Sequence, residues 1–131
     1  MSRQSSLEKD VIQEQLRNCP GIFFYRSQNK LEVIGRAIPE NPELVFNKLN
    51  DWISEYLKKN EGLNIFIQLE YINSGSSKYL FETLKSIDVE RRAGKEVAVK
   101  WLFEEDDEAM RELGEHYRDT SGLPMIVEMV L

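Results

Sequence analysis

The feature of this sequence that most restricts its fold is the alternation of strand-like and helix-like apolar patterns. Three apolar runs of strand length, Leu63–Tyr71, Val97–Phe103 and Met125–Leu131, are separated by segments whose apolar residues recur at helical spacing. A strand, a helix and a second strand in succession are typical of a βαβ unit with parallel strands. The sequence therefore predicts an α/β domain with a mostly parallel sheet.

Three helices are expected, one before the first of these strands and one in each of the two gaps. Asn41 and Pro42 fit the N-cap and the first position of the first helix. Gly94 is expected to end the second helix. The residues expected to face the core are Val45, Leu49, Trp52, Ile53, Tyr56 and Leu57 in the first helix, Leu80, Phe81, Leu84 and Ile87 in the second, and Met110, Leu113 and Tyr117 in the third.

The clearest strand, Leu63–Tyr71, carries apolar residues on both faces. Phe66 lies opposite the face predicted for its other apolar residues, which are Ile65, Ile67, Leu69 and Tyr71. Apolar residues on both faces favour a central strand that is covered, at least in part, on both sides.

The N-terminal part of the chain shows a different pattern. Apolar residues at helical spacing in Leu7–Arg17 predict a short amphipathic helix, so residues 1–20 are expected to form an N-terminal helix or extension. Ile22–Arg26 and Leu31–Ala37 are predicted to be two short strands joined by a turn at residues 27–30. Residues 21–131 are expected to form a single domain, since domains of this length are common.

Composition excludes several classes of function. The 131 residues carry a net charge of −6 and no basic patch, which argues against binding to nucleic acid. No apolar run is long enough to cross a membrane or to form a signal peptide, so a cytoplasmic location without membrane contact is expected. Cys19 and His116 are the only residues of their types, and neither has a neighbour with which to bind a metal or form a nucleophile. No metal, cofactor or enzymatic activity is expected.

A polar elbow, Asn73–Ser77, joins the clearest strand to the second helix. A helix start favours an anion, because its backbone N–H groups and its dipole are positive there. The glycine and lysine spacing of a nucleotide-binding phosphate loop is absent. The residues alone leave three interpretations of the elbow open. Ser76 or Ser77 caps the helix, a serine of the elbow carries a covalent phosphate, or the elbow binds a small anion.

The acidic run Glu104–Glu108 precedes the predicted third helix. Carboxylates in a first helical turn complement the helix dipole, so this run is expected to open the helix without forming a tight metal site. Five consecutive acids exceed what a helix start requires. A site for a hard cation and a docking patch for a basic partner stay open as alternatives.

Three segments together resemble a known family. They are Gly35–Pro42, Leu69–Lys78 and Trp101–Glu108, and they occur in the order found in SiaC-type bacterial regulatory phosphoproteins. The resemblance extends from about Leu31 to the C-terminus. It implies a STAS-like fold similar to the anti-sigma-factor antagonists, with a mixed sheet of four to five strands flanked by helices.

The family is phosphorylated on a threonine within an Asn-Thr-Ser-Ser-x-Lys elbow. Asn73 and Lys78 match this pattern directly, and Ser74 occupies the threonine position. Gly75 replaces the first serine of the pattern, and Ser76 matches the second. The resemblance therefore implies that Ser74 is the phosphorylated residue, since serine keeps the hydroxyl.

The resemblance also implies the partners. A kinase and a phosphatase of the partner-switching type would act on Ser74, and the unphosphorylated form would bind an effector such as a diguanylate cyclase, in the regulation of cyclic-di-GMP and biofilm formation. The alternative function is a STAS-like module that binds a small anionic ligand or nucleotide at the same elbow. The expected partner-binding residues are Asn73, Gly75, Ser76, Ser77 and Lys78.

Overall fold

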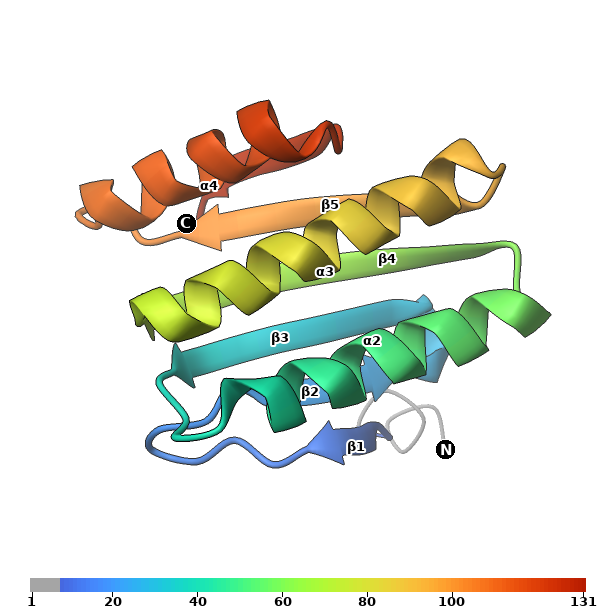
Figure 1. Ribbon diagram of the computed structural model, residues 1–131, viewed down its shortest axis with the longest axis horizontal. Helices are drawn as coiled ribbons and strands as arrows, with labels where there is room; N and C mark the ends of the chain where they lie inside the picture. Colours follow the sequence, from blue (N-terminus) through green and yellow to red (C-terminus); the bar gives the residue numbers. More distant parts are fainter. Residues whose placement is uncertain (1–7) are drawn as a thin grey trace.

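The computed structural model describes residues 8–131, which form one sheet covered by helices (Figure 1). The strands are β1 (Asp10–Gln13), β2 (Gly21–Tyr25), β3 (Lys30–Ala37), β4 (Gly62–Ile72), β5 (Glu96–Phe103) and β6 (Met125–Met129), and the helices are α2 (Pro42–Lys59), α3 (Ser74–Arg92) and α4 (Glu108–Ser121). The six strands lie in the order β1-β2-β3-β4-β5-β6. A single 3₁₀ turn, Arg26–Gln28, joins β2 to β3.

Strand direction divides the sheet into two parts. β1, β2 and β3 are antiparallel neighbours, whereas β3, β4, β5 and β6 are all parallel to one another. Each parallel pair is connected through one helix, as the alternating pattern predicts. The mixed α/β fold is confirmed, as are the three helices predicted around the parallel strands, but six strands are present where four to five were expected.

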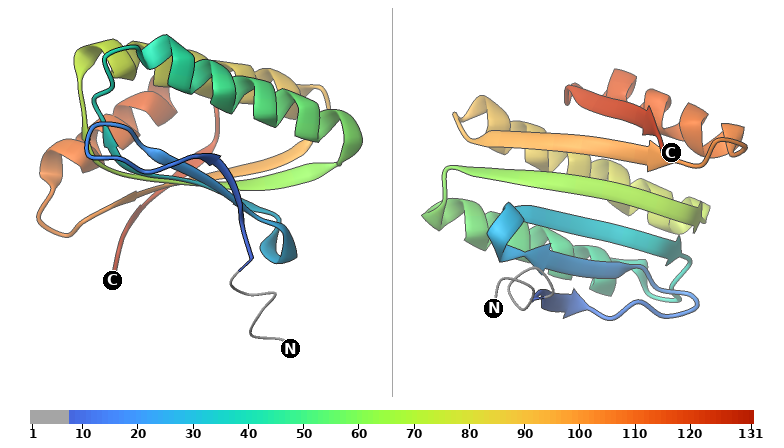
Figure 2. Two further views of the ribbon diagram at one scale, coloured as in Figure 1. Left: turned by 90° about the horizontal axis from the view of Figure 1, so that it is seen from below. Right: turned by 180° about the vertical axis from the view of Figure 1, so that it is seen from behind.

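All of the helices in the described chain lie on the same face of the sheet (Figure 2). They pack on a continuous core that includes the fully buried side chains of Phe46, Leu49, Leu80, Leu84 and Trp101. Trp101 is the largest of these, and its indole N–H donates a hydrogen bond of 2.9 Å to the carbonyl of Met110 in α4. This bond satisfies the one polar group that the tryptophan brings into the core.

In residues 8–131, the opposite face of the sheet carries no helix (Figure 2). β4 is a central strand, as expected, but the partial cover of its second face comes from side chains alone. Phe66 points to this open face and is half-buried. Its cover consists of long cationic side chains, because the ammonium groups of Lys30 and Lys100 lie 5.3 and 5.7 Å from the centre of its ring. The apolar residue on the second face of β4 is thus covered by neighbouring side chains and not by a second layer of helices.

The simple alternation predicted that Tyr71 lies on the core face of β4, but it does not. The pairing of β4 with β3 shifts after Gly35, which lies opposite Leu69, while Arg36 lies opposite Tyr71. The additional residue, Glu70, forms a bulge that reverses the side chains beyond it. Tyr71 is 53% exposed as a result.

The N-terminal segment is a strand and not the predicted helix. Residues 10–13 form β1, which pairs with β2 at the edge of the sheet, and the polypeptide then turns back between Leu16 and Cys19. Ile12 packs on the core, whereas Val11 is exposed. The first residue of the predicted helix, Leu7, lies outside the described residues. β1 is part of the main sheet, so this segment is not a separate helix beside residues 21–131.

A substitution of Gly114 in α4 tests how tightly the core packs around Trp101. A Cβ at this position would lie 2.3 Å from Trp101 Cδ1, well inside van der Waals contact, and both groups are in the buried core. We expect Gly114→Ala to lower the free energy of unfolding by about 1–3 kcal/mol, as overpacked cores do. Urea denaturation followed by tryptophan fluorescence measures this change.

The matched control is Gly75→Ala, also in a helix. A Cβ on Gly75 would have no neighbour closer than 3.8 Å, so its stability should change by less than about 1 kcal/mol. Equal midpoints for Gly114→Ala and the unmodified protein would show that the helix can move away from Trp101 at little cost.

Candidate functional site

The candidate site lies at the edge of the sheet where the parallel strands end. β3, β4 and β5 run in the same direction, so their carboxyl ends and the starts of α2, α3 and α4 meet along one edge, at the left in Figure 1. The connections at this edge carry the three segments on which the family resemblance rests. Loops at the carboxyl ends of parallel strands are the usual place for functional residues in α/β proteins.

Asn73 fixes the elbow between β4 and α3. Its backbone is extended, its N–H donates to the carbonyl of Ala37 at 3.2 Å, and its side-chain Oδ1 accepts a hydrogen bond of 2.8 Å from the N–H of Ser76. Its own carbonyl accepts the first helical bond, from the N–H of Ser77, at 2.9 Å. Asn73 is therefore the N-cap of α3, a role that the sequence had suggested for Ser76 or Ser77.

The hydroxyl groups of the elbow lie in different environments. Ser74 is the first residue of α3 and is exposed. Ser76 is fully buried, and its Oγ has no hydrogen-bond partner within the described chain. Ser77 is half-buried and hydrogen bonded to the hydroxyl of Tyr117 in α4.

Tyr117 joins α4 to the start of α3. Its hydroxyl also donates to the backbone carbonyl of Ser77 at 3.0 Å, and burial raises the pKa of this phenol above its ordinary value. Its ring packs edge-on against Trp101, with ring centres 5.4 Å apart. The elbow is thus held to the core from the side of α4, while Ser74 is exposed and takes part in none of these bonds.

Gly75 and Lys78 complete the predicted set. Both are exposed, and Lys78 takes part in no ion pair with another residue of the described chain. A side chain on Gly75 would meet only ordinary contacts, with Asn73 Oδ1 at 3.8 Å and Pro42 Cγ at 3.9 Å. The serine that the family carries at this position would therefore fit without strain.

The acidic run lies at the same edge but is not mainly helical. Residues 104–107 form the turn between β5 and α4, and only Glu108 belongs to the helix. Asp107 is the N-cap, and its Oδ1 accepts a hydrogen bond of 3.1 Å from the N–H of Met110. The prediction that the whole run opens the helix is therefore wrong. In residues 8–131, no group of three or more His, Cys, Asp or Glu side chains is placed to hold a metal ion.

The single histidine and the single cysteine show no sign of a catalytic or metal-binding role. His116 is exposed on α4, as predicted. Cys19 is buried, and burial raises the pKa of its thiol, so the reactive thiolate is disfavoured.

None of the helices in the described chain combines the length and the apolar character that a membrane crossing requires.

The family model of SiaC regulatory phosphoproteins matches residues 13–129, which is most of the sequence. The chain belongs to the SiaC family. The recognition made from the three segments is therefore confirmed, and the match also includes the last residue of β1 and all of β2, which lie outside the resemblance seen in the sequence.

Individual proteins agree with this assignment. An uncharacterized protein of Pseudomonas aeruginosa (strain UCBPP-PA14) is 25% identical over 100 residues, which cover 76% of this chain and 79% of that protein. Apo-SiaC from Pseudomonas aeruginosa has the same fold, with a TM-score of 0.81 at 22% identity over 93% of this chain and 99% of that one.

A second similar structure contains a partner. It is the crystal structure of the diguanylate cyclase SiaD in complex with its activator SiaC from Pseudomonas aeruginosa, with a TM-score of 0.80 and 23% identity. The match covers 88% of this chain and 95% of that one. These structures establish the SiaC-like fold, while the expected likeness to STAS domains stays a prediction.

Sequence reasoning located the elbow but missed its support. Tyr117 was predicted to face the core, yet nothing in the sequence links it to Ser77, which lies 40 residues earlier. The contact from Asn73 to Ala37 was also not foreseen, because it crosses from the end of one strand to the next. The one available signal was the Asn-x-x-Ser spacing, which fits an asparagine N-cap as well as a serine one.

Asn73 offers a test of the elbow. We expect Asn73→Ala to lower the free energy of unfolding by about 1 kcal/mol, because the N–H of Ser76 loses its acceptor. Asn73→Asp keeps an acceptor oxygen and should retain most of the stability, since its charge also suits the helix start. Thermal denaturation followed by circular dichroism compares the two. Equal loss in both variants would show that the acceptor oxygen of Asn73 does not account for its contribution to stability.

Proposed function

We propose that this member of the SiaC family is a non-enzymatic switch protein that binds an effector under the control of reversible phosphorylation of Ser74. The family is one of regulatory phosphoproteins, and a protein of the same fold is the activator of a diguanylate cyclase in a solved complex. A diguanylate cyclase is therefore the first effector to test. A partner-switching kinase and phosphatase would set the phosphorylation state.

The accessibility of Ser74 is the observation that carries this proposal. A kinase must reach the hydroxyl that it modifies, and only Ser74 among the elbow serines is exposed. Ser76 is fully buried, and Ser77 is hydrogen bonded to Tyr117. Modification of either would require α3 to move away from its neighbours.

The start of α3 can accept a phosphate without unfolding. Ser74 is the first helical residue, where backbone N–H groups lack helical partners and the helix dipole favours negative charge. Lys78 follows one turn later, at the spacing at which an anion and a cation face each other on a helix. The phosphorylated domain should therefore keep its fold, and phosphorylation should change its affinity for the partner.

The partner would contact the exposed part of the elbow. Asn73 is half-buried, while Gly75 and Lys78 are exposed beside Ser74 and offer small or cationic groups. The side chain of Ser76 is fully buried, so a partner that binds the folded domain would not contact it directly. A phosphate adds a charge of about −1.5 to −2 to this patch. A partner that packs closely on it would have to desolvate that charge, at a cost of several kcal/mol.

The alternative, a site for a small anionic ligand or nucleotide, has less support. Strand order advances in one direction through the whole sheet, so the described topology lacks the reversal at which open α/β sheets usually bind nucleotides. The neighbouring β5–α4 turn is also rich in carboxylates, which oppose an anion. A ligand copurifying with unmodified Ser74 would favour this alternative.

Phosphorylation can be tested directly at Ser74. We expect intact-mass and phosphopeptide analysis of the protein from its native host to find phosphate on Ser74. In titrations with the diguanylate cyclase of the same host, Ser74→Ala should bind as the unmodified protein does, and Ser74→Asp at least tenfold more weakly, because a charge then faces the partner.

Ser86→Asp is the matched control, since Ser86 is exposed on the same helix but away from the elbow. It should bind normally. Phosphate found only on Ser76 or Ser77, or equal affinity for Ser74→Ala and Ser74→Asp, would place the switch elsewhere.

A further inference from the structure

A groove with an apolar floor lies at the carboxyl end of the sheet. It has a volume of about 340 Å³ and is bounded by the ends of β3, β4 and β5 and by the β5–α4 turn. Its apolar lining comes from Ile34, Leu69 and Phe103. Ile34 and Phe103 are half-buried, so apolar surface is available to an incoming group.

Carboxylates also line this groove. Glu70, Glu104, Asp106 and Asp107 all line the groove, and the first three are exposed. Asp107 accepts a hydrogen bond from the N–H of Met110, and Glu104 accepts one of 3.4 Å from the side-chain amide of Gln68. These neutral donors satisfy individual oxygens but do not cancel the charge.

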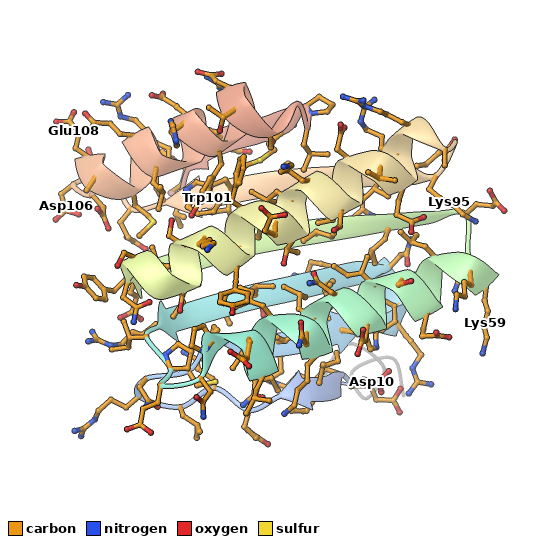
Figure 3. The ribbon with its side chains drawn as sticks, viewed as in Figure 1. Asp10, Lys59, Lys95, Trp101, Asp106 and Glu108 are labelled. Atoms are coloured by element: carbon orange, nitrogen blue, oxygen red, sulfur yellow. The ribbon has the colours of Figure 1, made fainter. Side chains whose placement is uncertain are left out.

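No cation of residues 8–131 forms an ion pair with any of these four carboxylates. Arg111, in the first turns of α4, is paired instead with Glu108 and Glu115. Lys59 and Lys95 lie at the opposite edge of the sheet from Asp106 (Figure 3). The groove is therefore lined by four carboxylates that form no ion pair, beside its apolar residues, and Arg36 at the end of β3 lies instead over the ring of Tyr71, 5.9 Å from its centre.

This combination matches the side chain of a basic residue. The methylene groups of arginine or lysine pack on apolar surface while the charged end reaches a rim of acceptors. Arginine suits the rim better, because its guanidinium donates to two carboxylate oxygens at once. A bare metal ion would gain nothing from the floor, and the carboxylates do not form a metal-binding group within the described chain.

We propose that the groove is a docking site for a basic segment of a protein partner, with an arginine side chain lying over Phe103 and its guanidinium on Glu70 and Asp106. The occupant is defined by charge complementarity. The groove does not include Ser74 or any other residue of the elbow. The inference therefore does not depend on phosphorylation, and it can fail or hold separately from the switch.

The probe is the peptide acetyl-Arg-Arg-Arg-amide, titrated into the ¹⁵N-labelled protein and followed by NMR. Shifts should be largest at residues 68–70 and 104–107, and they should weaken as salt is raised. The double variant Glu70→Gln/Asp106→Asn should bind at least fivefold more weakly. Its fold should be unchanged, because both side chains are exposed and neither is a cap. The peptide acetyl-Gln-Gln-Gln-amide should cause no such shifts.

Glu112→Gln is the matched control, since it removes one charge from an exposed position of α4 outside the groove. It should lower affinity by less than twofold. Shifts spread evenly over the acidic surface, or equal losses per charge removed in the control and the double variant, would overturn the proposal. So would displacement of the peptide by micromolar calcium or magnesium, because it would identify the groove as a metal site.

Discussion

The right-handedness of βαβ connections determines most of this architecture. Strands β3 to β6 follow one another across the sheet without a reversal, and each connection passes through one helix. Because such connections are right-handed almost without exception, a constant direction of travel places every helix on the same face. One face of the sheet is therefore left without helices, and the starts of all three helices in the described chain meet at one edge. The elbow and the groove both belong to that edge.

Much of this fold was accessible from the sequence. The apolar spacing predicted α2, α3 and α4, the β2–β3 pair and the strands between the helices, since each pattern extends over enough residues to define a period. It did not reveal the open face, because Phe66 is covered by the side chains of Lys30 and Lys100 and reads as a core residue. Nor did it reveal β1, where apolar residues happen to fit a helical period but backbone pairing with β2 determines the structure.

The candidate site could likewise be predicted only in part from the sequence. The elbow is a local motif, so its residues could be named from the sequence, and the position of Ser74 at the helix start follows from the cap at Asn73. The different environments of the serines are tertiary effects. Burial of Ser76 requires the sheet, and the bond to Ser77 requires Tyr117 from another helix. The groove combines Ile34, Glu70 and Asp106 from three separate connections or strands, which no local pattern can bring together.

The two proposals place opposite electrostatic demands on a shared edge. A basic segment in the groove would be attracted by the carboxylates, and a phosphate on Ser74 would add to the same negative field. Long-range attraction alone would then strengthen binding on phosphorylation, contrary to the proposed switch. Salt limits such attraction to about 8–10 Å under physiological conditions. Inhibition must therefore act at short range, through the desolvation of a dianion beneath a closely packed partner. Raising the salt concentration should accordingly weaken docking at the groove while leaving the block at Ser74 in place. This difference separates the two contributions within one complex.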